Sequence, residues 1–328
     1  MIKTTIKNER LIAHKTECLV IFSTEEKNPS GKLAELDTKL NGIIKSSFKN
    51  KRFQGKLNQT ILLNTKKPMQ AEHLLLVGLG KSIEITADKL RQAAGTAAKF
   101  AEKSNLKTVS FFIPANDPAN YISVALSESN ESFAQTVVEG SLLSLHHFDE
   151  HKQLAKDKLS RLKKITLLTS LKSQVSSLRY SASKGQKITR AVLASRDLIS
   201  QPSNIATPTY LADKAREFAK SFGMTCKVLA TGDMKRLGMG ALLGVAKGSE
   251  EPPVFIVLEH NGGTKNDPPV VIVGKGITFD TGGISLKPPA SMDEMKMDMS
   301  GAAITLGTLS AAAALKIPLN VVGLIPAS

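Results

Sequence analysis

Short apolar runs alternate with amphipathic stretches along the chain. Four of the runs are too short and too continuous for surface helices, and they predict buried strands at Cys18–Phe22, Leu74–Val77, Val109–Ile113 and Ile165–Leu168. Between them, Leu90, Ala93, Ala97 and Ala101 recur at helical spacing behind a candidate N-cap at Thr86. A second helix is expected from about Glu131 to His147. Strands and helices in turn predict an α/β fold with a parallel sheet and crossover helices.

The alternation pauses at residues 171–185, which are polar, basic and serine-rich, as a linker would be. We therefore expect a domain boundary near 172, with one α/β domain at 1–172 and a second at 173–328. In the second domain, helices are expected around Lys187–Ile199, from Pro208 to near Gly223, and from about Ser300 to Leu315. Strands are expected at Lys227–Ala230, Val254–Leu258, Val270–Val273 and Leu319–Ile325.

The net charge of +15 suggests a polyanionic partner such as nucleic acid. Its distribution changes that picture, because residues 151–200 alone carry 12 Lys and Arg against 2 Asp and Glu. A solvated basic surface between two domains and a nucleic-acid site both explain such a segment, and the solvated surface is the commoner case. No apolar run approaches the ~20 residues of a membrane span. The N-terminus lacks a secretory pattern and only Cys18 and Cys226 are present, so we expect a cytoplasmic protein without a membrane partner.

One short motif invites a metal-site interpretation. His147-Phe148-Asp149-Glu150-His151 matches the His-x-x-Glu-His pattern of some zinc peptidases, in which two histidines share a helix face. The segment runs directly into a polar, basic stretch, so we interpret it as a solvated helix end.

The stretch VVIVGKGITFDTGGISLKPPASMDEMKMDMSGAA, residues 270–303, carries a stronger signal. An apolar strand delivers Lys275 to its carboxyl end, where open α/β sheets place ligands. A glycine-rich loop then presents Asp280 and Lys287, and Asp298 follows as the next helix begins. Taken singly, Asp298 is explained as a helix cap and the lysines as solvated side chains. Two carboxylates and two lysines together predict a site for a hard metal ion or a phosphate.

Residues 270–303 closely resemble the metal-binding loop of the leucine aminopeptidase family, the zinc- or manganese-dependent cytosol aminopeptidases. Other stretches agree: LLLVGLGK at 74–81, ASRDLISQPSNIATPTYLA at 194–212 and VVGLIPAS at 321–328. The resemblance spans essentially the whole chain. It implies a macrodomain-like N-terminal α/β domain followed by an α/β metallopeptidase domain.

The resemblance also implies roles for individual residues. Lys275 and Asp298 match ligands of the tightly bound metal ion, and Asp280 matches the carboxylate that bridges two ions. Lys287 matches the catalytic lysine, which would stabilise an oxyanion. Met295 matches a wall of the pocket for the substrate's first side chain. The implied enzyme removes N-terminal residues from peptides with a water activated by two divalent ions, zinc or manganese.

This chain also departs from the family pattern. The second metal motif of the family, Asn-Thr-Asp-Ala-Glu-Gly-Arg, occurs nowhere in 1–328. That motif supplies two further ligands and an arginine that holds bicarbonate. We therefore expect a chain that ends before the second motif and has little or no peptidase activity alone. The resemblance implies a homo-hexamer for the complete enzyme. The alternative is a non-catalytic DNA-binding protein on the same fold.

Overall fold

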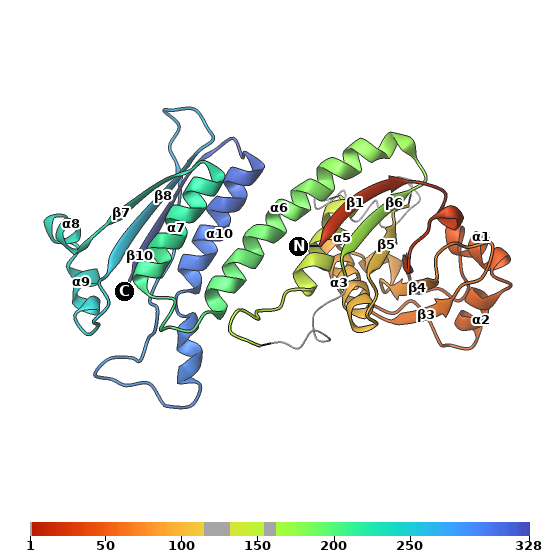
Figure 1. Cartoon of the computed structure of the whole chain (residues 1–328), viewed down its shortest axis with the longest axis horizontal. Helices are drawn as coiled ribbons and strands as arrows, with labels where there is room; N and C mark the ends of the chain where they lie inside the picture. The colour runs from red at the N-terminus through yellow and green to blue at the C-terminus, as the bar shows by residue number, and fades with distance from the viewer. Residues whose placement is uncertain (1, 115–131, 154–161) are drawn as a thin grey trace. The chain divides into compact units, whose positions relative to one another are not determined.

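The computed structural model describes residues 2–114, 132–153 and 162–328. The chain divides into two compact units, Met1–Gln186 (unit 1) and Lys187–Ser328 (unit 2), each with its own β-sheet (Figure 1). An α/β architecture is thus confirmed for both.

Unit 1 contains a six-stranded sheet in the order β1-β6-β5-β2-β4-β3. Its strands are β1 Lys3–Asn8, β2 Cys18–Ser23, β3 Thr60–Asn64, β4 His73–Gly78, β5 Thr108–Phe112 and β6 Lys164–Thr169. All pairings are parallel except that of β3 with β4. The four strands expected from apolar runs are confirmed. The strands β1 and β3, which are less buried than the central strands, give no such run.

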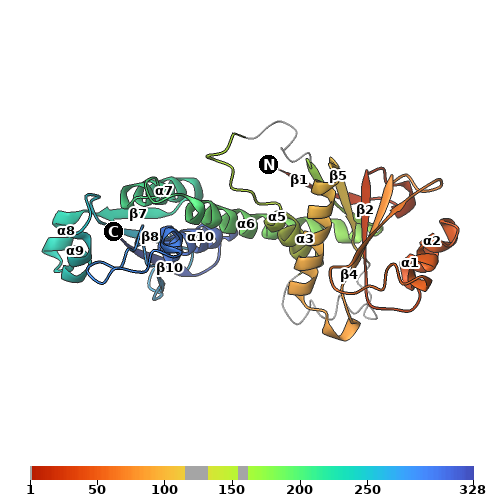
Figure 2. The same ribbon diagram turned by 90° about the horizontal axis from the view of Figure 1, so that it is seen from below.

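Two helical layers enclose this sheet (Figure 2). Helices α3 (Ala87–Lys103) and α5 (Phe133–Ser144) cover one face, while α1 (Gly31–Lys39) and α2 (Ile43–Lys49) cover the other. Strand β2 shows why, because Cys18 and Val20 face α3 whereas Leu19 and Ile21 face α1 and α2. The expected Thr86 cap is confirmed, since its hydroxyl accepts a hydrogen bond from Lys89 N at 3.2 Å.

The expectation of a linker at 171–185 is wrong. After a short 3-10 turn, helix α6 runs from Val175 to Ser200. Leu178 and Ala182, one helical turn apart, are 8% and 4% exposed and pack into the core of unit 1. A narrow buried stripe is enough to hold a helical segment whose other positions are mostly polar, and composition alone concealed it.

Unit 2 contains a four-stranded sheet in the order β7-β8-β10-β9. Its strands are β7 Thr225–Leu229, β8 Val254–Asn261, β9 Val270–Val273 and β10 Asn320–Ala327, and its helices besides the end of α6 are α7 Pro208–Phe222, α8 Thr231–Arg236, α9 Gly240–Ala246 and α10 Ser300–Leu315. The sheet is mixed rather than parallel, because β8 is antiparallel to both neighbours while β9 and β10 are parallel. Apolar runs locate strands but carry no information on their direction, so the parallel sheet expected from alternating strands and helices does not describe unit 2.

Helices cover only one face of the sheet in unit 2. Leu198, α7 and α10 pack on that face. Along β8 and β10, buried residues alternate with half-exposed ones, and the half-exposed set includes Val257 and Leu324. On the neighbouring β9, Val271 and Val273 are 51% and 68% exposed. The opposite face of the sheet is therefore apolar and open to solvent within these residues.

No helix among the described residues is long and apolar enough to cross a membrane.

A buried histidine fastens the connection between β1 and β2. His14 is 2% exposed; its Nδ1 lies 2.7 Å from Glu9 Oε2 and its Nε2 lies 2.9 Å from Ser110 Oγ on β5. The Ser110 hydroxyl donates in turn to Thr16 Oγ1 at 3.0 Å. The order Ser, His, Glu resembles a nucleophilic triad, but Ser110 is only 1% exposed and no substrate reaches it. The network is structural.

We predict that His14→Ala lowers the free energy of unfolding by about 2–4 kcal/mol, because it leaves a cavity and removes two hydrogen bonds. Urea unfolding followed by circular dichroism measures this. The control is His73→Ala at the start of β4, whose half-buried ring hydrogen-bonds Asn64 Oδ1, and we expect it to cost less than about 1 kcal/mol. Equal losses in the two variants would contradict the role assigned to His14.

Candidate metal centre

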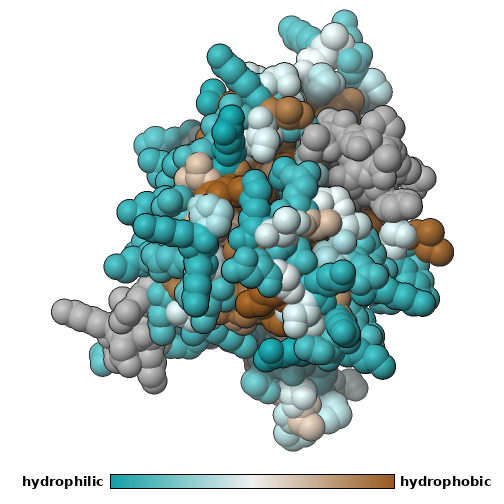
Figure 3. All heavy atoms as spheres, turned by 90° about the vertical axis from the view of Figure 1, so that its right-hand side faces the viewer, coloured by the Kyte–Doolittle hydropathy of each residue, from teal (hydrophilic) through white to brown (hydrophobic). Residues whose placement is uncertain are grey.

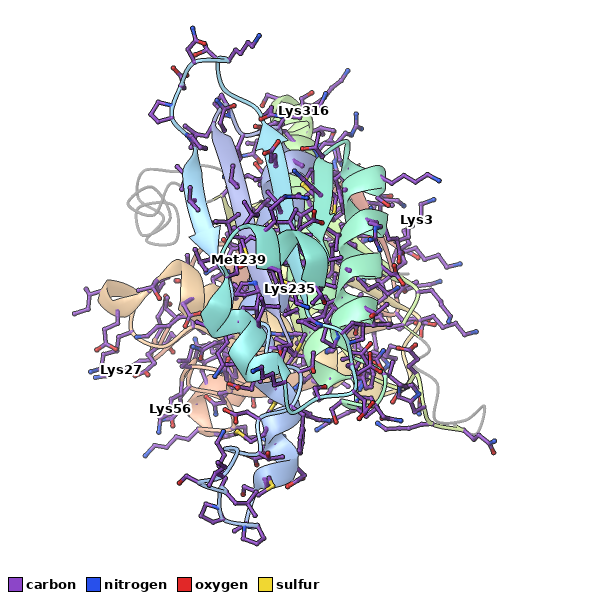
Figure 4. All side chains as sticks on the ribbon, turned by 90° about the vertical axis from the view of Figure 1, so that its left-hand side faces the viewer. Lys3, Lys27, Lys56, Lys235, Met239 and Lys316 are labelled. Atoms are coloured by element: carbon purple, nitrogen blue, oxygen red, sulfur yellow. The ribbon has the colours of Figure 1, made fainter. Side chains whose placement is uncertain are left out.

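The residues singled out in 270–303 gather at the carboxyl end of β9. Gly274 N donates a hydrogen bond to the Leu324 carbonyl at 2.9 Å, which continues the pairing of β9 with β10 up to Lys275. The chain then forms a loop from 276 to 291 and a 3-10 turn at Met292–Met297 before α10 begins (Figure 1). Figure 4 shows Lys316, the residue after α10, at the opposite end of unit 2 from this loop. The loop residues thus lie at the strand terminus that the sequence predicts.

Two glycines allow the end of β9 to lie directly against the start of α10. Ala302 N, in the first turn of α10, donates to the Lys275 carbonyl at 2.8 Å. A Cβ added at Gly301 would come within 2.7 Å of Lys275 N, and one added at Gly274 within 2.4 Å of the Gly301 carbonyl oxygen. Neither position has room for a side chain. This contact brings Lys275 next to Asp298, the residue that leads into the helix.

Four charged side chains alternate in sign across the site. Lys275 Nζ lies 2.7 Å from Asp298 Oδ2 and 4.0 Å from Asp280 Oδ2. Lys287 Nζ lies 2.9 Å from the same Asp280 oxygen. Asp280 therefore sits between two ammonium groups, and the four charges balance.

These contacts lower the pKa of the Asp280 carboxyl below its ordinary value. The largest cause is the hydrogen bond from Lys287, followed by the hydrogen bond from Gly282 N at 2.8 Å; the charge of Lys275 contributes less. Asp280 is consequently a carboxylate well into the acidic range, which is the state that a metal ligand requires.

Met295 lies at the edge of the same cluster. Lys287 Nζ donates to Met295 Sδ at 3.1 Å, so the thioether and the ammonium group face each other across the loop. The structure thus brings together all five residues singled out from the sequence: Lys275, Asp280, Lys287, Met295 and Asp298. Asp298 is not the cap of α10, because Met299 occupies the N-cap position.

One oxygen in the cluster indicates that the donor set suits a cation. Asp298 Oδ2 is buried and accepts no hydrogen bond of suitable direction, although Lys275 Nζ is only 2.7 Å away. Coordination of a divalent ion does not require the direction that a hydrogen bond requires. An amine together with two carboxylates forms a donor set for zinc or manganese. These three donors fit one ion. Among the described residues, no group of three His, Cys, Asp or Glu side chains is placed to hold a metal ion.

The histidine motif at 147–151 is not part of any such group. Helix α5 ends at Ser144, so His147 and His151 do not share a helix face. His147 Nε2 lies instead 3.1 Å from Glu102 Oε2 at an exposed position. The interpretation of the motif as a solvated helix end is corrected in one respect: the motif forms no metal-binding group within the described residues, but it lies beyond the end of the helix rather than on it.

Sequence reasoning missed the two glycines that set the geometry, Gly274 and Gly301. The signal was present in the small residues that flank Lys275 and begin α10, but only the paired backbones reveal which of them are in contact.

Comparison with protein families gives two matches along the chain. Residues 19–154 match the N-terminal domain of the cytosol aminopeptidase family, and residues 193–328 match the catalytic domain of the same family. The second match contains the whole charged cluster.

Curated relatives are similar over most of this chain. A probable cytosol aminopeptidase of Geotalea uraniireducens is 44% identical over 90% of this chain and 57% of its own length. One of Syntrophotalea carbinolica is 37% identical over 95% of this chain and 62% of its own length. The chain therefore spans about three fifths of the length of these relatives.

Solved structures agree. A tomato leucine aminopeptidase mutant superimposes with a TM-score of 0.81 at 25% identity, covering 100% of this chain and 62% of that one. The bottromycin maturation enzyme BotP in complex with Mn superimposes with a TM-score of 0.74 at 26% identity, covering 95% of this chain and 59% of that one. The resemblance inferred from the residues is confirmed. The chain belongs to the cytosol aminopeptidase family.

Proposed function

We propose that this protein is a metal-dependent aminopeptidase that removes N-terminal residues from peptides. The observation that carries the proposal is the alternating cluster of Lys275, Asp280, Asp298 and Lys287 at the end of β9, within the region matched by the catalytic-domain family model. The sequence places the start of the catalytic part near 173, whereas the two compact units divide between Gln186 and Lys187; we assign the N-terminal domain to unit 1 and the catalytic part to unit 2. We place the protein in the cytoplasm.

Lys275, Asp280 and Asp298 would hold the metal ion, zinc or manganese. A bound divalent ion supplies Lewis-acid chemistry, by acidifying water and polarising a carbonyl group. Lys275 ligates only as a neutral amine, and here it forms an ion pair with Asp298. Loading of the site must therefore break this pair and release a proton from Lys275 Nζ.

Lys287 has a different task. It keeps its proton and donates to Asp280 while no substrate is present. An ammonium group held at the rim of the site is suited to stabilise negative charge that develops on the carbonyl oxygen of the scissile bond. Met295, in contact with Lys287, would form part of the wall against which the substrate's first side chain packs.

The residues present are sufficient for one ion and not for two. We propose that a second ion, an arginine-bound bicarbonate and a homo-hexameric assembly depend on residues outside 1–328, because the relatives are longer and the acidic second motif does not occur here.

The first prediction concerns acidity. The Asp280 carboxyl titrates below its ordinary value in the metal-free chain, and Lys287→Ala raises its midpoint, because the principal hydrogen bond is lost. The pKa of Asp280 is lower in the folded than in the unfolded state. The contact with Lys287 therefore stabilises the fold at pH values above the pKa of the unfolded state, and this stabilisation is lost as the pH falls through the pKa of the folded state. Carbon-13 NMR of the side-chain carboxyl measures both midpoints. An unchanged midpoint in Lys287→Ala would contradict the assignment.

The second prediction concerns metal binding. The 328-residue chain binds about one Mn²⁺, and Asp280→Asn or Asp298→Asn weakens binding at least about tenfold, because each removes a charged ligand. Calorimetry in buffers of different ionisation enthalpy detects the proton released from Lys275. The matched control is Asp267→Asn, whose carboxylate accepts a hydrogen bond from Thr264 N in another loop of unit 2. Equal weakening by the control, or binding without proton release, would contradict the proposed ligand set.

The third prediction concerns activity. The 328-residue chain with added manganese hydrolyses leucine amide at no more than a background rate, whereas the protein purified from its native source hydrolyses it and loses activity when a chelator removes the metal. Intact mass of the native protein is measured alongside. Robust hydrolysis by the 328-residue chain would refute the requirement for further residues, and an inactive native protein would refute the peptidase function itself.

A further inference from the structure

A pocket of about 940 Å³ lies in unit 1, and none of its lining residues belongs to the metal centre. Four segments form it: the connection between β1 and β2 at residues 10–15, helix α1, the loop that carries Pro68 and Gln70, and Ser170 just after β6. Its volume is within the range of pockets that bind small molecules, roughly 300–1,000 Å³. Figure 3 shows the side of unit 1 that faces the viewer, where hydrophilic residues predominate with smaller hydrophobic patches between them.

The walls of this pocket are held in place by contacts already formed. His14 ties the 10–15 segment to Ser110 on β5 and to Glu9. Gln70 N donates to the Ile12 carbonyl at 2.9 Å, which joins the Pro68–Gln70 loop to the same segment. A preorganised wall lowers the entropic cost of binding a ligand.

The floor of the pocket is apolar and its rim is basic. Leu11 and Leu36 are 3% and 2% exposed and belong to the core beneath α1 and α2. On α1, Lys32, Leu36 and Lys39 are spaced by four and three residues, so they share one face of the helix. That face places two ammonium groups on either side of an apolar contact.

The charges of the lining do not cancel. Four lining residues, Arg10, Lys15, Lys32 and Lys39, are basic, and Glu35 is the one acidic residue among them. Lys32 already pairs with Glu35. Within the described residues, Arg10 and Lys15 have no carboxylate at ion-pair distance, and the nearby Glu9 is engaged by His14 and Lys7. A cleft lined by one sign of charge concentrates ligands of the opposite sign.

We propose that this pocket binds a small phosphate monoester with an apolar or aromatic body. The phosphate would lie among Arg10, Lys15 and Lys39, because a guanidinium fork and neighbouring ammonium groups match a dianion. The apolar body would lie against Leu11 and Leu36. This site is separate from the metal centre and does not depend on the proposed peptidase function.

Phenyl phosphate is the probe for this proposal. Inorganic phosphate is the control that carries only the charge, and benzyl alcohol is the control that carries only the apolar body. Calorimetry on the 328-residue chain should show saturable binding of one phenyl phosphate, at least about tenfold tighter than either part. Shift changes in a nitrogen-15-labelled chain should concentrate at residues 10–15 and 32–39. Absence of saturable binding, or shift changes confined to other residues, would overturn the proposal.

The double variant Arg10→Ala/Lys39→Ala should weaken phenyl phosphate binding about tenfold or more, because two charge-assisted contacts are lost. The matched control is Lys49→Ala/Lys99→Ala, which removes the same charge from exposed positions on α2 and α3 outside the pocket. All four side chains are exposed, so both variants should melt at the temperature of the parent chain. If the control variant weakened binding equally, the loss would follow from the change in net charge alone, and the proposed site would be wrong. Phenylacetate binding as tightly as phenyl phosphate would overturn the assignment to a phosphate.

Discussion

The close contact between the end of β9 and the first turn of α10 determines the geometry of the metal centre. The contact depends on the absence of side chains at Gly274 and Gly301, whose backbones meet where a Cβ would collide. The Ala302 N–H completes the junction by donating to the Lys275 carbonyl. Because the junction is made by backbone atoms, the side chains of Lys275 and Asp298 are left free to meet beside it.

The two lysines of the charged cluster counteract the repulsion between carboxylates that a metal site has when no metal ion is bound. Carboxylates brought together without a cation repel each other, and the two lysines offset that repulsion while no ion is bound. In the proposed function, Lys275 would have two exclusive roles: as an ammonium group it would substitute for the cation, and as an amine it would become a ligand. Lys287 keeps one role in both states. This difference explains why two residues of one type occur in one site.

The sequence predicts the central elements well and the peripheral ones poorly. Strands such as Cys18–Ser23 and Val270–Val273 are buried or continuous enough to be found from apolar runs alone. The first part of helix α6 was mistaken for a linker because its buried residues in the core of unit 1 are only Leu178 and Ala182, whereas its second part was expected as a helix at Lys187–Ile199. Strand direction in unit 2 has no signature in composition. Lys275, Asp280, Lys287 and Asp298 were singled out from their pattern at the end of a strand, and the resemblance added their roles and Met295. The basic pocket was not found, because Arg10 and Lys39 line it together only through the fold.

The central claim is that Lys275, Asp280 and Asp298 exchange an internal ion pair for a metal ion. Anomalous diffraction from crystals of the 328-residue chain grown with Mn²⁺ tests it most directly. One anomalous peak is predicted within ligand distance of Lys275 Nζ and one oxygen each of Asp280 and Asp298, with the contact between Lys275 and Asp298 broken. A peak elsewhere, or a Lys275–Asp298 pair that persists beside a bound ion, would contradict it.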